Sequence, residues 1–381
     1  MKNLTMLESV HGDTCRLGYL KLLCCLGDDF QPYSLEYFSS RLYTLTKDYY
    51  KKWSFPSGLS RIGLITEKQG LTISKNYVNL SYEFGVLNRQ HQTLGNFGRL
   101  YSKTDSAKTV INFIQNAEAR FTNVLILNDF ERVLFLKQLL EVDGLPMFYI
   151  VKWLDELYEK GRNSVSRKEA MVHFMEKDYP KICSELAEST QNYEKRIRFK
   201  KEAERAQTTF SKIRIENENK GTWNKSALYA KYRHTVPPRF EWLVDVGLLQ
   251  KEGKGNYIIL PLVRDIYDFI SETNVESFKD EIYFHLGRKY LNISDRASRK
   301  EIEELLFHCY SKFERAGHLA VDRSLFVNFV AFQMLEIRRK LVKLSEINTV
   351  IEDLHRHDPK LVQYHVDLTG KWRFIKIGSK K

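Results

Sequence analysis

Residues 224–261 read NKSALYAKYRHTVPPRFEWLVDVGLLQKEGKGNYIILP, and this stretch decides the fold. Its amphipathic start, residues 225–233, predicts a helix, and the Val-Pro-Pro that follows predicts a turn. A second short helix is expected over 239–246, ended by a glycine. Two β-prone runs then flank a Gly-Lys-Gly tip, where glycine can take the positive φ angle of a hairpin. The predicted order is helix, turn, helix, hairpin.

The composition allows a large core and favours an anionic partner. The chain has 381 residues, of which 43% are hydrophobic, so it is long enough for two or three domains and is not a disordered protein. It carries 60 Lys and Arg against 48 Asp and Glu, a formal net charge of +12. This excess attracts polyanions such as nucleic acid or an anionic membrane face.

Cysteine usage and hydropathy predict a soluble protein of the cytoplasm. The five cysteines have no Cys-x-x-Cys pair or regular spacing, which is typical of reduced, buried thiols. The apolar run nearest the N-terminus, residues 17–26, contains Lys21 and is too short to span a bilayer. We therefore expect no membrane partner.

The glycine that ends the second helix has a counterpart near the N-terminus. Residues 84–88, FGVLN, share with residues 246–250, VGLLQ, a helix end, a glycine, two apolar residues and a polar one. A hairpin-like pair, 64–66 and 71–73, is expected before a helix over 74–84. Residues 86–87 and 98–101 are then expected to be two strands, joined by a loop over 88–97. This pattern predicts one or two further helix-and-hairpin units, and an ordinary mixed α/β domain is the alternative.

Residues 225–260, above all FEWLVDVGLL and the Gly-Lys-Gly tip, resemble the winged helix-turn-helix superfamily. The larger layout of several such units in a basic helical chain is loosely similar to multi-winged-helix proteins of prokaryotic restriction and anti-phage systems. The resemblance implies a DNA-binding subunit of a defence or mobile-element system. The metal-binding carboxylates of the nuclease members are not found, which puts cleavage in doubt.

The fold class predicted is mostly α with small β-hairpins (α+β), arranged as two or more winged-helix units on a helical frame. The expected divisions are 1–105, a winged-helix-like domain; 106–180, a helical domain; 181–222, a charged linker helix; 223–262, a winged helix; and 263–381, a helical domain with a C-terminal β-hairpin. In the last division we expect helices over 262–270, 275–291, 299–314, 323–344 and 345–355.

The charged linker carries a narrow apolar seam. Its members recur at steps of 4, 3, 4 and 3: Phe199, Ala203, Ala206, Phe210 and Ile213. A solvated helix resting on one domain is one interpretation, and a homodimer or partner helix is the other. The cations around the seam could lie along phosphates: Lys195, Arg196, Arg198, Lys200, Lys201 and Arg205.

The N-terminal unit has the better chemistry for DNA. Lys75, Asn76, Asn79 and Tyr82 would share one helix face, and amide and hydroxyl groups can contact bases and phosphates. The hairpin expected after the helix adds Arg89 and Arg99, with Gln90, His91 and Gln92. Glu83 is the only acid expected at this helix and hairpin, and its carboxylate would repel a phosphate.

In the 223–262 unit the second helix is expected to turn four side chains outward: Arg239, Glu241, Trp242 and Asp245. Two acids repel phosphates, so this helix can read a groove only if Arg239 and the hairpin lysines Lys251 and Lys254 dominate. The alternative is a unit that packs against other domains or a protein partner.

No catalytic, metal or cofactor-binding residue is predicted. The Glu-x-Lys matches at 218–220 and 252–254 lack a strand Asp, and the histidines at 355, 357 and 365 match no zinc spacing. Phosphate-loop and dinucleotide motifs are absent from the sequence.

Three hypotheses follow. The first is a non-enzymatic protein that binds double-stranded DNA through winged helices and basic phosphate contacts, within a larger complex and associated with the nucleoid. The second is a metal-dependent restriction-type endonuclease. The third is a protein-interaction adapter in which the winged helices act as packing modules, with the acidic face of the 239–246 helix as its binding surface.

Overall fold

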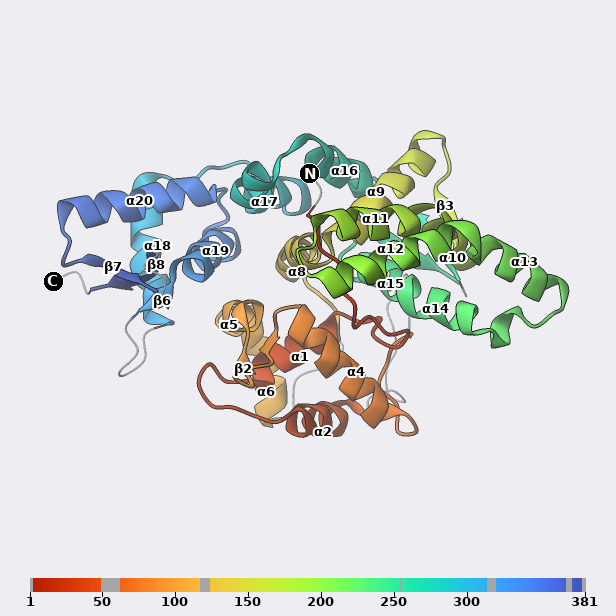
Figure 1. The fold of residues 1–381 in the computed structure, drawn as a ribbon. Coiled ribbons are helices and arrows are strands. Elements are labelled where there is room, and N and C mark those ends of the chain that lie inside the picture. The colour runs from red at the N-terminus through yellow and green to blue at the C-terminus, as the bar shows by residue number, and fades with distance from the viewer. Residues whose placement is uncertain are drawn as a thin grey trace.

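The computed structural model describes residues 3–48, 62–116, 124–253, 255–313, 320–367 and 372–378. Within these ranges the chain is mostly helical, and its strands form one two-stranded and two three-stranded antiparallel sheets. This confirms the mostly-α class with small β-hairpins. Figure 1 shows the N-terminal helices in one lobe, the middle helices in a second and the C-terminal helices in a third. No helix of the described part is long and apolar enough to cross a membrane.

The N-terminal lobe is a helical cluster with a short hairpin. Its elements are α1 (Gly18–Leu26), α2 (Leu35–Thr46), α4 (Gly70–Glu83), β1 (Leu87–Asn88), β2 (Thr93–Leu94) and α5 (Asn96–Tyr101). The helices α1, α2 and α4 pack on one another through buried side chains such as Leu20, Leu42 and Tyr77. The glycine at 85, with φ +80°, turns the end of α4 into β1.

Three strand predictions in this lobe were wrong. Residues 64–66 form no strand. Residues 71–73 belong to α4, because Ile73, Tyr77 and Leu80 recur at helical spacing and are buried together. Residues 98–101 belong to α5, where Phe97, Leu100 and Tyr101 pack inward. The hairpin partner of β1 is instead the two-residue β2, paired as Leu87 with Leu94.

The middle of the chain is helical, as expected, with one added strand. It comprises α6 (Ala107–Asn116), α8 (Asp129–Val142), α9 (Gly144–Glu159), β3 (Ser164–Ser166), α10 (Arg167–His173), the π-helical turn Phe174–Asp178 and α11 (Tyr179–Ser189). A reciprocal capping box starts α8: Glu131 N–H donates to the Asn128 side chain, and the Glu131 carboxylate accepts from Asn128 N–H.

The expected single linker helix is three elements: the end of α11, then α12 (Tyr193–Thr208) and α13 (Phe210–Asn219). The chain leaves the helical conformation at Thr190, and the Asn192 side chain caps α12 by accepting from Lys195 N–H. The helices α11 and α12 pack as a pair. The seam residues Phe199, Ala203 and Ala206 are buried, so within the described chain the seam rests on the protein itself.

The central unit has the predicted order of elements. After the 3₁₀ turn Trp223–Lys225 come α14 (Ala227–Thr235), α15 (Pro237–Asp245), β4 (Leu249–Glu252) and β5 (Asn256–Ile259). The glycine at 247 has φ +76° and ends α15 as expected. Beyond the prediction, β3 pairs with β5, Val165 opposite Tyr257. The hairpin is thus part of a three-stranded sheet.

The C-terminal lobe contains α16 (Leu262–Glu272), α17 (Val275–Tyr290), α18 (Arg299–Ser311), β6 (Val321–Asp322), α19 (Arg323–Gln333), α20 (Leu344–His357), β7 (Val362–Val366) and β8 (Trp372–Ile377). The helix expected over 323–344 ends early, because a π-helical turn, Met334–Arg338, leads to Arg339 at φ +54°. The predicted C-terminal hairpin is present and gains β6 as a third strand.

Candidate nucleic-acid interface

The helix α15 cannot read a groove, because all of its 9 residues are buried. The outward placement expected for Arg239, Glu241, Trp242 and Asp245 was therefore wrong. The Arg239 side chain is 1% exposed; its Nε and Nη2 donate to the two oxygens of Asp143, at 2.7 and 2.9 Å. A buried ion pair with this many hydrogen bonds satisfies both charges inside the protein.

The same helix holds the N-terminal segment. Trp242 Nε1 donates to the Thr14 carbonyl at 2.7 Å, and Leu17 N–H donates to Asp245 at 2.8 Å. Arg16 forms a buried ion pair with Asp245. Burial raises the pKa of Asp245 to about 6, although Arg16 and the Leu17 N–H act in the opposite direction. These contacts make α15 an internal packing element.

The hairpin of the central unit presents no cation at Lys251. This side chain is buried, and its Nζ donates to Glu241 at 2.7 Å beside the Tyr257 hydroxyl, which donates to the same oxygen at 2.8 Å. The expected phosphate contact through Lys251 was wrong, because Lys251 shares with Leu249 the buried face of β4, which packs on α15. Lys254 lies outside the described residues.

The helix α4 exposes the face that the sequence singled out. Lys75 is exposed, while Asn76, Asn79 and Tyr82 are half-buried along the same side of the helix. Beyond the helix end, the exposed Arg89 places its guanidinium 4.9 Å from the centre of the Tyr82 ring. We call these five side chains the α4 surface.

The one acid on this face is turned away from it. The Glu83 carboxylate accepts from the backbone N–H of Glu8 at 2.6 Å and of Ser9 at 3.0 Å. At the same edge of the helix the Asn76 amide nitrogen lies 3.1 Å from His11 Nδ1. Residues 8–11 therefore run along one edge of α4 and contact Glu83 and Asn76 there. Lys75, Asn79 and Tyr82 form the centre of the α4 surface.

A hollow of about 790 Å³ adjoins the hairpin after α4, and Tyr82, Arg89 and Arg99 all line it. The structure thus brings together three residues predicted from the sequence. Arg99 lies on α5 rather than on a hairpin strand, and its Nε is 3.7 Å from Asp29. No sequence pattern predicts that Arg373 lies here, yet β8 brings it to the same hollow, 274 positions after Arg99 in the chain.

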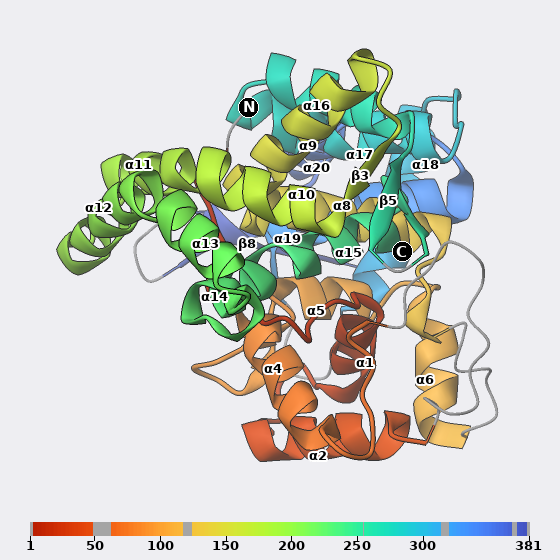
Figure 2. The same cartoon turned by 90° about the vertical axis from the view of Figure 1, so that its right-hand side faces the viewer.

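A second group of cations lies on α12. Arg198, Lys201 and Arg205 follow one another at steps of 3 and 4, so they share one face of the helix, and all three are exposed. We call them the α12 stripe. Figures 1 and 2 place α4 and α12 toward the same side of the molecule, at the left of Figure 2.

The two groups are joined through residues 8 and 9. Lys195 and Arg198 both donate to the Glu8 carboxylate, and the backbone of Glu8 is held by Glu83 of α4. Partial burial acts to raise the pKa of Glu8, but the hydrogen bonds and charges of Lys195 and Arg198 outweigh it and lower the pKa. Glu8 is therefore ionised and already neutralised by its neighbours.

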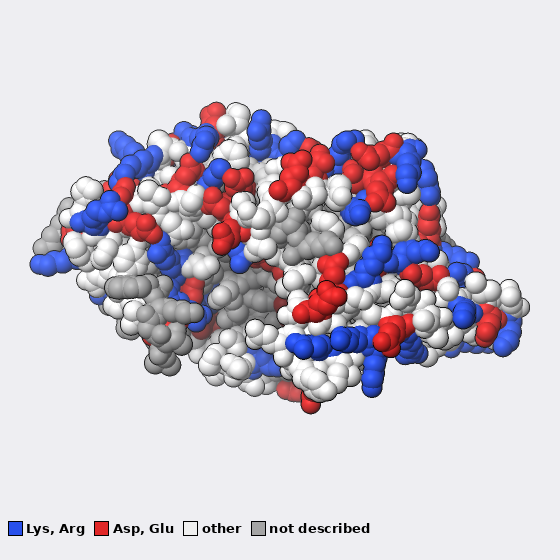
Figure 3. Space-filling view, turned by 45° about the horizontal axis from the view of Figure 1, so that its top comes forward, with Lys and Arg blue, Asp and Glu red and all other residues white. Residues whose placement is uncertain are grey.

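The face shown in Figure 3 is not a basic patch. Cationic and anionic side chains alternate over most of it, and the longer runs of Lys and Arg lie at its lower right, toward α12 and α13. In the described ranges, no three His, Cys, Asp or Glu side chains lie close enough to hold a metal ion.

Comparison with protein families found no family model that matches the chain, and no curated protein or solved structure matches it significantly.

Proposed function

We propose that this protein binds duplex DNA, with the α4 surface in a groove and the α12 stripe along the phosphates. The observation that carries the proposal is the face of α4 on which ammonium, amide, phenol and guanidinium groups lie together, while the carboxylate of Glu83 is bound to backbone N–H groups. Such groups are those that contact bases and phosphates.

The arrangement around α4 supports the proposal. The helices α1, α2 and α4 pack mutually, and a short antiparallel hairpin follows α4 directly. In a winged helix the third helix enters the major groove and the hairpin lies beside it. In this interpretation α4 is the recognition helix, and Arg89, in the turn of the hairpin, reaches a flanking phosphate.

The α12 stripe adds contacts that do not depend on sequence. Guanidinium and ammonium groups on one exposed helix face release condensed counterions when they meet phosphates. The stripe and the α4 surface are linked by the contacts of Glu8, so one duplex can meet both without a rearrangement of the described chain.

The experiment is a salt titration of binding to a fluorescent 20-base-pair duplex. Four exposed cations are counted, since Arg198 is already paired with Glu8: Lys75, Arg89, Lys201 and Arg205. If each neutralises one phosphate, the slope of log K against log salt is about −3.6, and affinity falls roughly 150-fold between 50 and 200 mM salt. Affinity that is independent of salt, or no binding at low salt, would overturn the proposal.

The structure gives less support to the two alternative hypotheses, the protein-interaction adapter and the metal-dependent nuclease. The acidic face of α15, expected to bind a protein partner, is buried within the chain and contacts Arg16, Lys251 and the N-terminal segment. A metal-dependent nuclease holds its ion with several side chains, and in the described ranges no three His, Cys, Asp or Glu side chains lie close enough to do so. Incubation of plasmid with magnesium or manganese tests this second hypothesis directly.

A further inference from the structure

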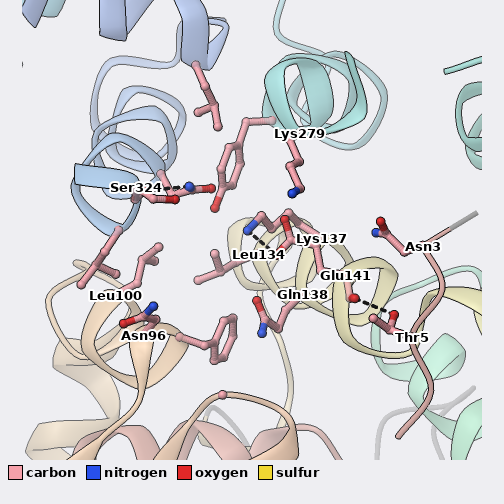
Figure 4. Close-up of a pocket in the computed structure, with 16 residues that line it drawn as sticks. Asn3, Thr5, Asn96, Leu100, Leu134, Lys137, Gln138, Glu141, Lys279 and Ser324 are labelled. Carbon is pink, nitrogen blue, oxygen red and sulfur yellow. Dashed lines mark hydrogen bonds and ion pairs between the residues drawn. The ribbon is translucent and has the colours of Figure 1, made fainter. Parts of the chain in front are cut away.

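A cavity of about 510 Å³ lies where the three lobes meet. It is enclosed by α5 and the end of α4 on one side, by α8 on a second, and by α17 and α19 on a third (Figure 4). Its volume is in the range of pockets that bind small molecules. The cavity lies outside the α4 surface and shares none of its side chains.

Two buried polar atoms at this cavity have no hydrogen-bond partner among the described residues. The Tyr283 side chain is 1% exposed and its hydroxyl is unpartnered. Asn328 uses its amide nitrogen to donate to the Ser324 carbonyl at 2.8 Å, and its Oδ1 is left without a donor. Buried polar groups in native proteins are normally satisfied, so these two atoms indicate a ligand with hydroxyl or amino groups.

The charges at the cavity favour an anion. Lys137 on α8 donates to Glu141 at 2.7 Å, and its ammonium lies 5.9 Å from the centre of the Tyr283 ring. In Figure 4 the Lys279 side chain extends from α17 toward Lys137 and Glu141. Two ammonium groups therefore face one carboxylate, which leaves a net positive charge. Burial raises the pKa of the Tyr283 phenol, so it remains a donor at neutral pH.

The lining also has five apolar side chains from α5, α8, α19 and the start of α20, which lie among polar ones such as Asn96 and Gln138: Phe97, Leu100, Leu134, Leu325 and Leu344. We call these five the apolar wall. A bare phosphate or a sugar phosphate would leave this wall without a partner. A ligand that meets all three requirements has a flat aromatic group to pack on the apolar wall and an anion to pair with the lysines. Hydroxyl groups between these two parts would bond to the Tyr283 hydroxyl and Asn328 Oδ1.

We propose that this cavity binds a nucleoside monophosphate. The phosphate lies at Lys279 and Lys137, the ribose hydroxyls bond to the Tyr283 hydroxyl and Asn328 Oδ1, and the base packs on the apolar wall. No phosphate-binding loop is required, because the two ammonium groups supply the charge.

Calorimetric titration of the full chain with AMP, GMP, CMP and UMP, in the absence of DNA, tests the proposal. We expect at least one of them to bind with a Kd below about 1 mM. The matching nucleoside, which lacks the phosphate, and ribose 5-phosphate, which lacks the base, should each bind at least tenfold more weakly. No binding by any of the four nucleotides, or equal binding of ribose 5-phosphate, would overturn it.

Two variants separate a binding role from a structural one. Tyr283→Phe removes only an unpartnered hydroxyl, so the Tm of the free protein should not fall, while nucleotide affinity drops at least fivefold. Lys279→Gln should weaken the nucleotide tenfold and leave the nucleoside unchanged. Lys300→Gln, an exposed lysine on α18 outside the cavity, is the matched control. Wild-type affinity in both cavity variants would contradict the assignment.

Discussion

Arg239 and Asp143 form a doubly hydrogen-bonded ion pair in the interior, with side-chain exposures of 1% and 0%. The pair joins α15 to the junction of α8 and α9, and Arg239 also donates to the Leu7 carbonyl at 3.0 Å. A guanidinium committed in this way cannot meet a phosphate, so Arg239 acts in stability rather than in recognition.

Breaking this pair should destabilise the protein strongly. Arg239→Met leaves the Asp143 carboxylate buried without its partner, and loss of one member of a buried pair costs about 3–5 kcal/mol of unfolding free energy. The measurement is the urea midpoint followed by circular dichroism. Lys152→Met is the control, because Lys152 and Glu156 form an exposed pair worth about 0–1 kcal/mol. Equal midpoints for the two variants would contradict the structural role.

Asp245 should make stability fall as the pH rises from 4 to 7. Its folded-state pKa of about 6 lies above its ordinary value of 3.8, so the folded state holds the proton more tightly than the unfolded state. The stabilisation by this proton is fully present below the unfolded-state pKa. It is lost as the pH rises through the folded-state pKa. The loss amounts to about 3 kcal/mol at most.

The matched comparison for this effect is Asp245→Asn, which cannot ionise. We expect the unfolding free energy of the wild type, relative to that of the variant, to decrease between pH 4 and pH 7. A relative increase over this range would show that Arg16 lowers the pKa of Asp245 below its ordinary value.

The α12 stripe should contribute to affinity but not to sequence preference. Lys201→Glu with Arg205→Glu removes two phosphate contacts, so the salt slope should become shallower by about 2 and every duplex should lose affinity in the same proportion. Anisotropy titrations with three unrelated duplexes measure both quantities. A change in the ranking of the duplexes would mean that the stripe reads bases.

Local signals in the sequence predicted much of the fold. The glycines at 85 and 247 end their helices, and Val236 separates α14 from α15, whose first two residues are prolines, because these residues act through their own backbone conformations. The helices α16 and α17 lie within a few residues of the predicted ranges, because their apolar residues recur at the helical period.

The burial of Arg239 and Lys251 could not be predicted from local pattern. Lys251 is buried because the face of β4 that it shares with Leu249 packs on α15, where Glu241 accepts its hydrogen bond. Asp143, the partner of Arg239, is 96 positions away. Packing between separate elements leaves no periodic signal in the sequence. In contrast, Lys75, Asn76, Asn79 and Tyr82 were correctly placed on one face, since α4 is a regular helix.

Membership of a defence or mobile-element system stays a prediction from the sequence resemblance alone. The burial of α15 and Lys251 is the reason why the proposed DNA contact is assigned to the N-terminal lobe and α12.

The most direct test of the central claim is the affinity of the double variant Lys75→Glu and Arg89→Glu for duplex DNA in 100 mM salt. Lys300→Glu with Lys360→Glu, exposed residues in the C-terminal lobe, changes the net charge equally and is the control. We expect the first variant to lose at least 30-fold in affinity, about 2 kcal/mol, and the control to lose less than threefold. Equal losses in the two variants would show that net charge alone, and not the α4 surface, binds DNA.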